Sequence, residues 1–206
     1  MPPIPSFEAC YRSSGVKERA AHSQSGYLMR IMGLLLVMAL LSTVALMPKS
    51  ASADIGPAKT LVPSAALVGE GRMTVLGFRI FDAALFAPSG SFKQNKPFAL
   101  KLTYLRKFTG EAIAERTAKE MRRQGMKEGP RLTDWTLALK AILPNVSAGS
   151  SITGVRNNKA QTVLYANNQP IGQIADPEFT RRFFDIWLGS NTNDPALRNK
   201  LIGKGS

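Results

Sequence analysis

The stretch that decides the fold is Val68-Gly69-Glu70-Gly71-Arg72, which is followed by Phe81-Asp82-Ala83-Ala84-Leu85-Phe86-Ala87-Pro88. Both runs have the apolar character of strands, and Gly77 between them indicates a bend or tight turn. Arg72 lies beside permissive glycines where an apolar strand begins. A single fixed cation that faces an apolar cavity is typical of a ligand site, so Arg72 is the first candidate for a ligand contact.

The hydrophobic pattern around this stretch predicts strands at both ends of the domain and helices between and after them. We expect strands at about residues 65–68 with 73–76, 78–86, 98–104, 151–156, 160–165 and 171–174, and helices at about 109–124, 133–143, 177–188 and 196–202. Antiparallel strands with segregated helices predict an α+β domain in which the helices cover one face of a sheet.

The clearest helix signal begins at Asp176, which is a good N-cap and precedes Pro177 at the first helical position. Gly189 follows the expected end of the helix. Apolar side chains recur at helical spacing from Phe179 to Trp187, so this helix is expected to be largely buried.

The N-terminal part of the chain has the pattern of a secretory signal peptide, assigned to residues 1–53. It has a basic start at Met29-Arg30, an apolar run over residues 31–47 and a small-residue site at Ala51-x-Ala53. Cleavage before Asp54 would place the protein in the periplasm or outside the cell. The alternative is that Ile31 to Met47 remains as a membrane anchor, because it is close to the lower limit of roughly 17 residues for a spanning helix. The sequence before Met29 is long and mixed for a signal peptide, which makes Met29 an alternative start.

Residues 54–206 are expected to form a single domain without cysteine or histidine, because the only cysteine is Cys10 and the only histidine is His22. Disulfides, thiolate chemistry, imidazole base catalysis and metal sites with nitrogen or sulfur ligands are therefore excluded for this domain. The carboxylates that remain have no recognisable ligand spacing. The sequence thus predicts no metal and no cofactor.

The charge of the domain is strongly positive. Five of the 27 basic and two of the 14 acidic residues lie in residues 1–53, so residues 54–206 carry a net charge of +10. This balance favours an anionic ligand or an anionic membrane surface as a partner, and the alternative is a set of solvated charges that keeps a monomer soluble. No basic stripe interleaved with aromatic residues indicates nucleic acid.

Read together, several segments resemble the chalcone isomerase superfamily, specifically its bacterial secreted chalcone-isomerase-like branch, from Leu67 to Gly203. The segments that carry the resemblance are Gly69-x-Gly71-Arg72, Phe81-Asp82-Ala83-x-Leu85-Phe86-Ala87-Pro88, Gly110 with Glu120-Met121, Ala175-Asp176-Pro177-Glu178-Phe179 and Phe184-x-Ile186-Trp187-Leu188. The resemblance implies an open-faced β-sandwich, in which a large antiparallel sheet has helices layered on one face and a cleft holds an apolar ligand.

The resemblance also implies roles for single residues. The family's ligand-facing arginine matches Arg72, whereas three polar positions of the enzymes fall on Phe81, Ile113 and Ile186, which have no polar group. The position of Ile113 is that of the catalytic tyrosine. Ring closure in these enzymes needs donors aimed at a developing enolate, and losing one such donor typically costs ~2.7–4 kcal/mol of barrier. The substitutions therefore argue against chalcone cyclisation.

The leading hypothesis is a non-catalytic, exported binder of an apolar anion such as a fatty acid or a polyketide-like acid. It predicts a closed apolar cavity of roughly 300–1,000 Å³ with Arg72 at one end. The expected ligand contacts are Arg72, Phe81, Tyr104, Ile113 and Ile186.

Two other functions remain open at this point. An isomerase or lyase acting on an enone or enolate would use Arg72 electrostatically, with Tyr104 or Thr74 as a second polar group. An envelope interaction protein would use its basic face and have a filled core. For Arg72 itself the alternative is an exposed side chain paired with an acid such as Glu70.

Two further side chains, Arg106 and Tyr165, are secondary candidates for contacts with a polar head group. The alternative for each is a half-exposed strand residue.

Overall fold

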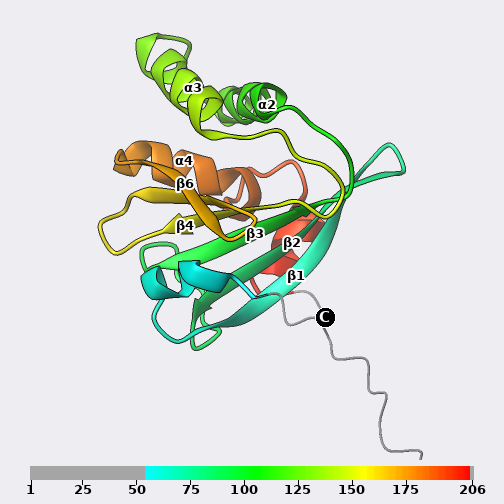
Figure 1. Cartoon of the computed structure of the whole chain (residues 1–206), viewed down its shortest axis with the longest axis vertical. Helices are drawn as coiled ribbons and strands as arrows, with labels where there is room; N and C mark the ends of the chain where they lie inside the picture. The colour runs from blue at the N-terminus through cyan, green and yellow to red at the C-terminus, as the bar shows by residue number, and fades with distance from the viewer. Residues whose placement is uncertain (1–53, 205–206) are drawn as a thin grey trace, which may run out of the picture. The chain divides into compact units, whose positions relative to one another are not determined.

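In the computed structural model, which describes residues 54–204, six antiparallel strands form one sheet in the order of the chain (Figure 1). The strands are β1 (Ala65–Val75), β2 (Phe78–Pro88), β3 (Phe98–Tyr104), β4 (Ser151–Arg156), β5 (Thr162–Ala166) and β6 (Gln169–Ile174). The helices are η1 (Gly56–Leu61), a 3-10 helix, and α2 (Gly110–Arg123), α3 (Pro130–Ile142), α4 (Pro177–Leu188) and α5 (Pro195–Leu201). The predicted α+β class and order of elements are confirmed.

Both faces of the sheet carry apolar clusters, because side chains alternate between the faces along each strand. In β2, Phe81, Ala83 and Leu85 belong to the cluster that packs under α2, α3, α4 and α5. Ala84 and Phe86 belong to a smaller cluster that η1 covers on the opposite face. The main helices therefore lie on one face, as predicted, and η1 adds a cover on the other that the sequence did not indicate.

The turn between β1 and β2 is a two-residue hairpin, as Gly77 indicated. Leu76 and Gly77 both have positive φ, at 50° and 80°. Two positive values are typical of a type I′ turn, whose twist matches that of the flanking strands. The strand before this turn pairs with β2 on both sides of Gly69 and Gly71, with irregularities in the register between Leu67 and Gly69 and between Met73 and Thr74.

Two helix starts can be compared with their expected caps. Thr109 caps α2 as predicted, because its Oγ1 accepts the backbone N–H of Ala112 at 3.1 Å. The predicted start of α3 at Thr133 is wrong, since the helix begins one turn earlier with Pro130 at its first position. A proline there fixes φ and leaves no N–H unpaired. Thr133 Oγ1 instead donates to the carbonyl of Gly129 at 3.2 Å.

Helix α5 packs directly on β1, and two glycines allow the close approach. A Cβ at Gly69 would fall well inside contact distance of the carbonyl oxygen of Lys200, and one at Gly71 would lie 2.7 Å from Leu197 Cδ1. The glycines that first suggested a ligand site are thus explained by helix packing.

None of the helices in residues 54–204 has the length and apolar character needed to cross a bilayer. The predicted signal peptide, the alternative anchor at Ile31 to Met47 and the alternative start at Met29 all lie outside the described residues.

Candidate functional site

A cavity of about 380 Å³ lies between the sheet and the helices α2 and α4, and it is open to solvent on one side rather than closed as predicted. This volume is near the lower end of the range for ligand sites, which is roughly 300–1,000 Å³. Its wall is mostly apolar and comes from both layers: Met73, Ile80, Phe81, Leu102, Tyr104, Phe108, Ala112, Ile113, Arg116, Thr117, Glu120, Leu143, Ile152, Phe183, Ile186, Trp187, Thr192 and Asn193.

Four of the five predicted ligand contacts line this cavity, each from a different element. They are Phe81 of β2, Tyr104 of β3, Ile113 of α2 and Ile186 of α4. Phe81 and Tyr104 are cross-strand partners whose ring centroids lie 6.1 Å apart. Phe81, Ile113 and Ile186, which the resemblance aligns with polar residues of the enzymes, therefore all line the same cavity. Their side chains make this part of its wall apolar.

The fifth predicted contact, Arg72, does not line the cavity, and its expected place at the cavity end is corrected. Its Nε lies 2.6 Å from Asp82 Oδ1 and its Nη2 lies 3.0 Å from Asp82 Oδ2, on the sheet face opposite to the main helices. Each of the two side chains is 44% exposed. Met73, the next residue in β1, lines the cavity instead, because adjacent residues of a strand point to opposite faces. An exposed arginine paired with an acid is the arrangement observed, with Asp82 in the place expected for Glu70.

The hydroxyl of Tyr104 is the notable polar group of the inner wall. The side chain is 5% exposed, and no residue among 54–204 accepts or donates a hydrogen bond at this hydroxyl. Burial raises the pKa of Tyr104 above its usual value, so the phenol stays neutral and remains a donor at physiological pH. Among residues 54–204, Asn168 Oδ1 is the only fully buried side-chain polar atom without a partner, so the Tyr104 hydroxyl remains accessible to water. A polar atom of a ligand can take the place of that water.

A charged cluster forms one polar part of the cavity wall, and sequence reasoning missed it. The buried carboxylate of Glu120 binds Arg116 Nη2 at 2.7 Å and Arg123 Nε at 2.8 Å, and it also accepts from Asn193 Nδ2. Arg116 remains 62% exposed at the edge of the cavity. Its spacing from Ile113 on one helix face was the signal that could have identified it.

The secondary candidates lie elsewhere. Arg106 stacks over the ring of Phe78, with its Cζ 4.6 Å from the centroid. Tyr165 packs in the cluster under η1, on the opposite face of the sheet, and Thr74 is exposed in β1. No group of three or more histidine, cysteine, aspartate or glutamate residues within 54–204 is arranged to hold a metal ion.

Comparisons with known proteins agree with this fold. A family model described as chalcone isomerase-like matches residues 63–203. Among solved structures, a fatty-acid binding protein of Arabidopsis thaliana is similar with a TM-score of 0.54 and 13% sequence identity, over 68% of this chain and 88% of that one. At this identity the likeness shows the fold alone. A comparison with curated proteins gave no significant match. Since the family model covers well over half of the sequence, the chain belongs to the chalcone isomerase-like family.

Proposed function

We propose that this protein is a non-catalytic binder of a small apolar molecule with an anionic end, of the fatty-acid class. The observation that carries the proposal is the apolar cavity with the unpartnered Tyr104 hydroxyl in its wall. The name of the structurally similar Arabidopsis protein, a fatty-acid binding protein, supports the same ligand class.

The dimensions of the cavity restrict the ligand. At about 380 Å³ the space is near the lower limit for ligand sites, which favours an acyl chain of short or medium length. Arg72 lies on the opposite face of the sheet from this cavity, so it does not reach the anionic end of a ligand bound there. Arg116 is the cation of the cavity wall, so it is the group in a position to attract a carboxylate, although Glu120 neutralises part of its charge.

The composition of the wall argues against ring-closing catalysis. An isomerase needs several donors aimed at the developing negative charge. Phe81, Ile113 and Ile186 present only hydrocarbon to the cavity. Thr117, Thr192 and Asn193 already donate to other groups of the protein, which leaves Tyr104 and Arg116 as donors for a ligand among the described residues. Binding without reaction is the activity that this wall supports best.

The test is a ligand titration with a cavity-filling variant. Decanoate is titrated by calorimetry into delipidated wild type, Ile113→Trp and Leu137→Trp. Leu137 is 59% exposed on α3 and does not line this cavity, so its variant is the matched control. We expect Ile113→Trp to weaken binding at least tenfold and the control to change it less than twofold. Equal binding by all three proteins, or none by wild type, would contradict the proposal.

A second variant tests the polar contact inside the cavity. Tyr104→Phe removes only the hydroxyl, so the packing against Phe81 and Phe108 is kept. We expect weaker binding of decanoate by roughly threefold to tenfold, the size of one hydrogen bond, and no loss for an apolar probe such as decane. If Tyr104→Phe binds decanoate as tightly as wild type, the Tyr104 hydroxyl does not contact the ligand.

A second candidate function, contact with an anionic membrane, is favoured by the tip of the β1–β2 hairpin. Leu76 is 92% exposed and Phe78 is 56% exposed, with Arg79 beside them in sequence and Arg106 stacked on Phe78. Leu76 also holds a positive φ of 50°, which a bulky side chain rarely adopts. Exposed apolar side chains flanked by cations suit an anionic lipid surface.

Vesicle sedimentation tests this membrane contact. Wild type and Leu76→Asn are mixed with vesicles of phosphatidylcholine alone or with phosphatidylserine added. Asparagine tolerates the left-handed conformation, so the turn is kept. We expect binding to the anionic vesicles only, weakened several-fold in the variant and by added salt. Binding that is indifferent to vesicle charge and to Leu76 would exclude this surface.

Export and oligomeric state are part of the same proposal. We propose a monomer that is exported after cleavage before Asp54 and acts in the periplasm or outside the cell. The sequence pattern of residues 1–53 and the net charge of +10 on the remainder support this. Mass spectrometry of the intact protein from separated cell fractions would give both the N-terminus and the mass of any oligomer.

A further inference from the structure

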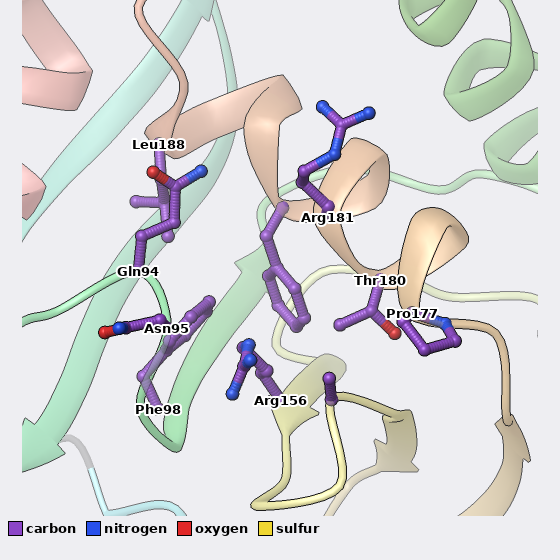
Figure 2. Close-up of a pocket in the computed structure, with 10 residues that line it drawn as sticks. Gln94, Asn95, Phe98, Arg156, Pro177, Thr180, Arg181 and Leu188 are labelled. Carbon is purple, nitrogen blue, oxygen red and sulfur yellow. The ribbon is translucent and has the colours of Figure 1, made fainter.

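A second cavity, of about 370 Å³, lies against a different face of α4 (Figure 2). It is bounded by the loop before β3, by the adjoining ends of β3 and β4, and by the helix. The residues that line it are Gln94, Asn95, Phe98, Arg156, Ala160, Pro177, Thr180, Arg181, Phe184 and Leu188. None of them lines the first cavity.

The register of the sheet places Arg156 in the wall of this second cavity. It is the last residue of β4 and pairs across the strands with Phe98, whose side chain belongs to the helix-side cluster. Directly opposite partners share a face, so Arg156 also points toward α4. Figure 2 shows its guanidinium between Phe98 on one side and Thr180 on the other.

The guanidinium of Arg156 has no acidic partner among residues 54–204. Its Nη1 donates to the carbonyl oxygen of Asn157 at 3.2 Å, and no described carboxylate lies within salt-bridge distance. Burial lowers the pKa of Arg156, as expected for a cation that is partly withdrawn from water without a counter-charge. Arg156 is only partly buried, so its guanidinium remains open to a ligand.

Among residues 54–204 the rest of the lining contains no acidic side chain and one further arginine, Arg181. Arg181 binds Asp185 at 3.3 Å and points away from Arg156 in Figure 2. Asp185 also accepts from Gln94 Nε2 at 2.7 Å, so it offsets the charge of Arg181 and leaves Arg156 as the cation available to a ligand. Phe98, Phe184 and Leu188 make the remaining surface apolar.

We propose that this second cavity binds a small organic carboxylate with an apolar body. The planar guanidinium of Arg156 binds the two carboxylate oxygens side by side, a geometry for which arginine is suited. The body of the ligand packs on Phe98, Phe184 and Leu188. The site stands on its own lining and does not depend on the function proposed for the first cavity.

The test compares benzoate with benzamide, which has the same shape and no charge. Binding to wild type, Arg156→Gln and Arg79→Gln is followed by NMR titration. Arg79 is an exposed arginine of β2 outside both cavities, so its variant removes the same charge from the surface. We expect benzoate to bind wild type at least tenfold more tightly than benzamide, Arg156→Gln to abolish this preference, and Arg79→Gln to keep it within twofold.

Two controls separate this site from folding and from the first cavity. Without ligand, Arg156→Gln should unfold at about the same temperature as wild type, because Arg156 is only partly buried and makes no ion pair within residues 54–204. Ile113→Trp should leave benzoate binding unchanged. The proposal is overturned if benzamide binds wild type as tightly as benzoate, or if Arg156→Gln retains the preference for benzoate. It is also overturned if Ile113→Trp abolishes that preference. Binding of inorganic phosphate as tight as that of benzoate would overturn it as well, since the apolar wall would then contribute nothing.

Discussion

At the scale of the residue, the alternation of side chains along β1 decides which groups can reach a ligand. Met73 faces the cavity and Arg72 faces away from it, although the two are adjacent. Arg72 satisfies its guanidinium with two contacts to Asp82, its direct partner across the strands. The cation on the cavity side comes instead from α2, at Arg116. Arg116 is thus the arginine in a position to bind an anionic ligand, whereas Arg72 is the one that the sequence singles out.

This separation predicts opposite outcomes for two arginine variants. Arg72→Ala should change the affinity for decanoate less than twofold, and Arg116→Ala should weaken it several-fold, because only Arg116 lies in the wall. The methyl ester of decanoate, which has no charge, should bind both variants alike. Calorimetric titration of the two ligands measures these affinities. If Arg72→Ala loses more affinity for decanoate than Arg116→Ala does, Arg72 and not Arg116 is the arginine that binds the ligand.

At the scale of the element, α4 is the helix shared by both cavities, and Asp176 sets where it begins. Asp176 Oδ1 accepts the backbone N–H groups of Glu178 at 2.8 Å and Phe179 at 3.2 Å. Its other oxygen accepts from Trp135 Nε1 at 3.1 Å and from Arg131. One side chain therefore caps α4 and ties it to α3.

The charge state of Asp176 makes this cap sensitive to acid. Burial acts to raise the pKa of Asp176, but the hydrogen bonds from Phe179, Arg131 and Glu178 outweigh it, so the pKa lies below its usual value of 3.8. A lowered pKa means that the folded state favours the carboxylate. Its stabilising contribution is complete above about pH 4 and is lost as the pH falls through the folded-state pKa.

Replacing the cap should accordingly cost more at neutral than at acid pH. Asp176→Ala is expected to lower the free energy of unfolding by about 1–2 kcal/mol at pH 7, and the difference from wild type should shrink below pH 3.8. Asp176→Asn keeps an oxygen acceptor and should lose less. Urea unfolding at pH 7, 5 and 3 gives these values. A difference that is the same at pH 3 as at pH 7 would argue against the charged cap.

At the scale of the whole molecule, the last helix packs on the first strand of the sheet. Gly69 lies against the backbone of Lys200, and Gly71 lies against the side chain of Leu197. The two contacts differ in kind, because a helix backbone cannot move without displacing α5, whereas a leucine side chain can change its conformation. Close packing of α5 on β1 completes the helix-side cluster through Leu197 and Leu201.

The difference predicts a ranking of two alanine variants. Gly69→Ala should destabilise the protein by at least about 2 kcal/mol, within the range known for overpacked sites. Gly71→Ala should cost less, since it meets only the end of a flexible side chain. Denaturant unfolding of both variants gives the order. A larger cost for Gly71→Ala would mean that α5 approaches β1 differently.

Local chemistry was enough to predict most elements from the sequence. Thr109 and Asp176 cap helices as expected, and Gly77 turns the first hairpin. The start of α3 was misjudged because Thr133 and Pro130 are both good start signals, and proline at the first position prevails. Phe81, Tyr104, Ile113 and Ile186 line the cavity and Arg72 does not, because the face on which a strand residue lies depends on register.

The sequence by itself determined the class of the domain, the order of its strands and helices, and the family resemblance, because caps, turns and periodicity act over a few residues. Only the tertiary structure decided which side chains share a cavity. Tyr104 meets Ile113 and Ile186 there, and Arg156 lies under α4 with no acidic partner in the described part of the chain, through contacts between segments far apart in the sequence. Such contacts depend on sheet register and on how closely helices pack, and no local pattern records either.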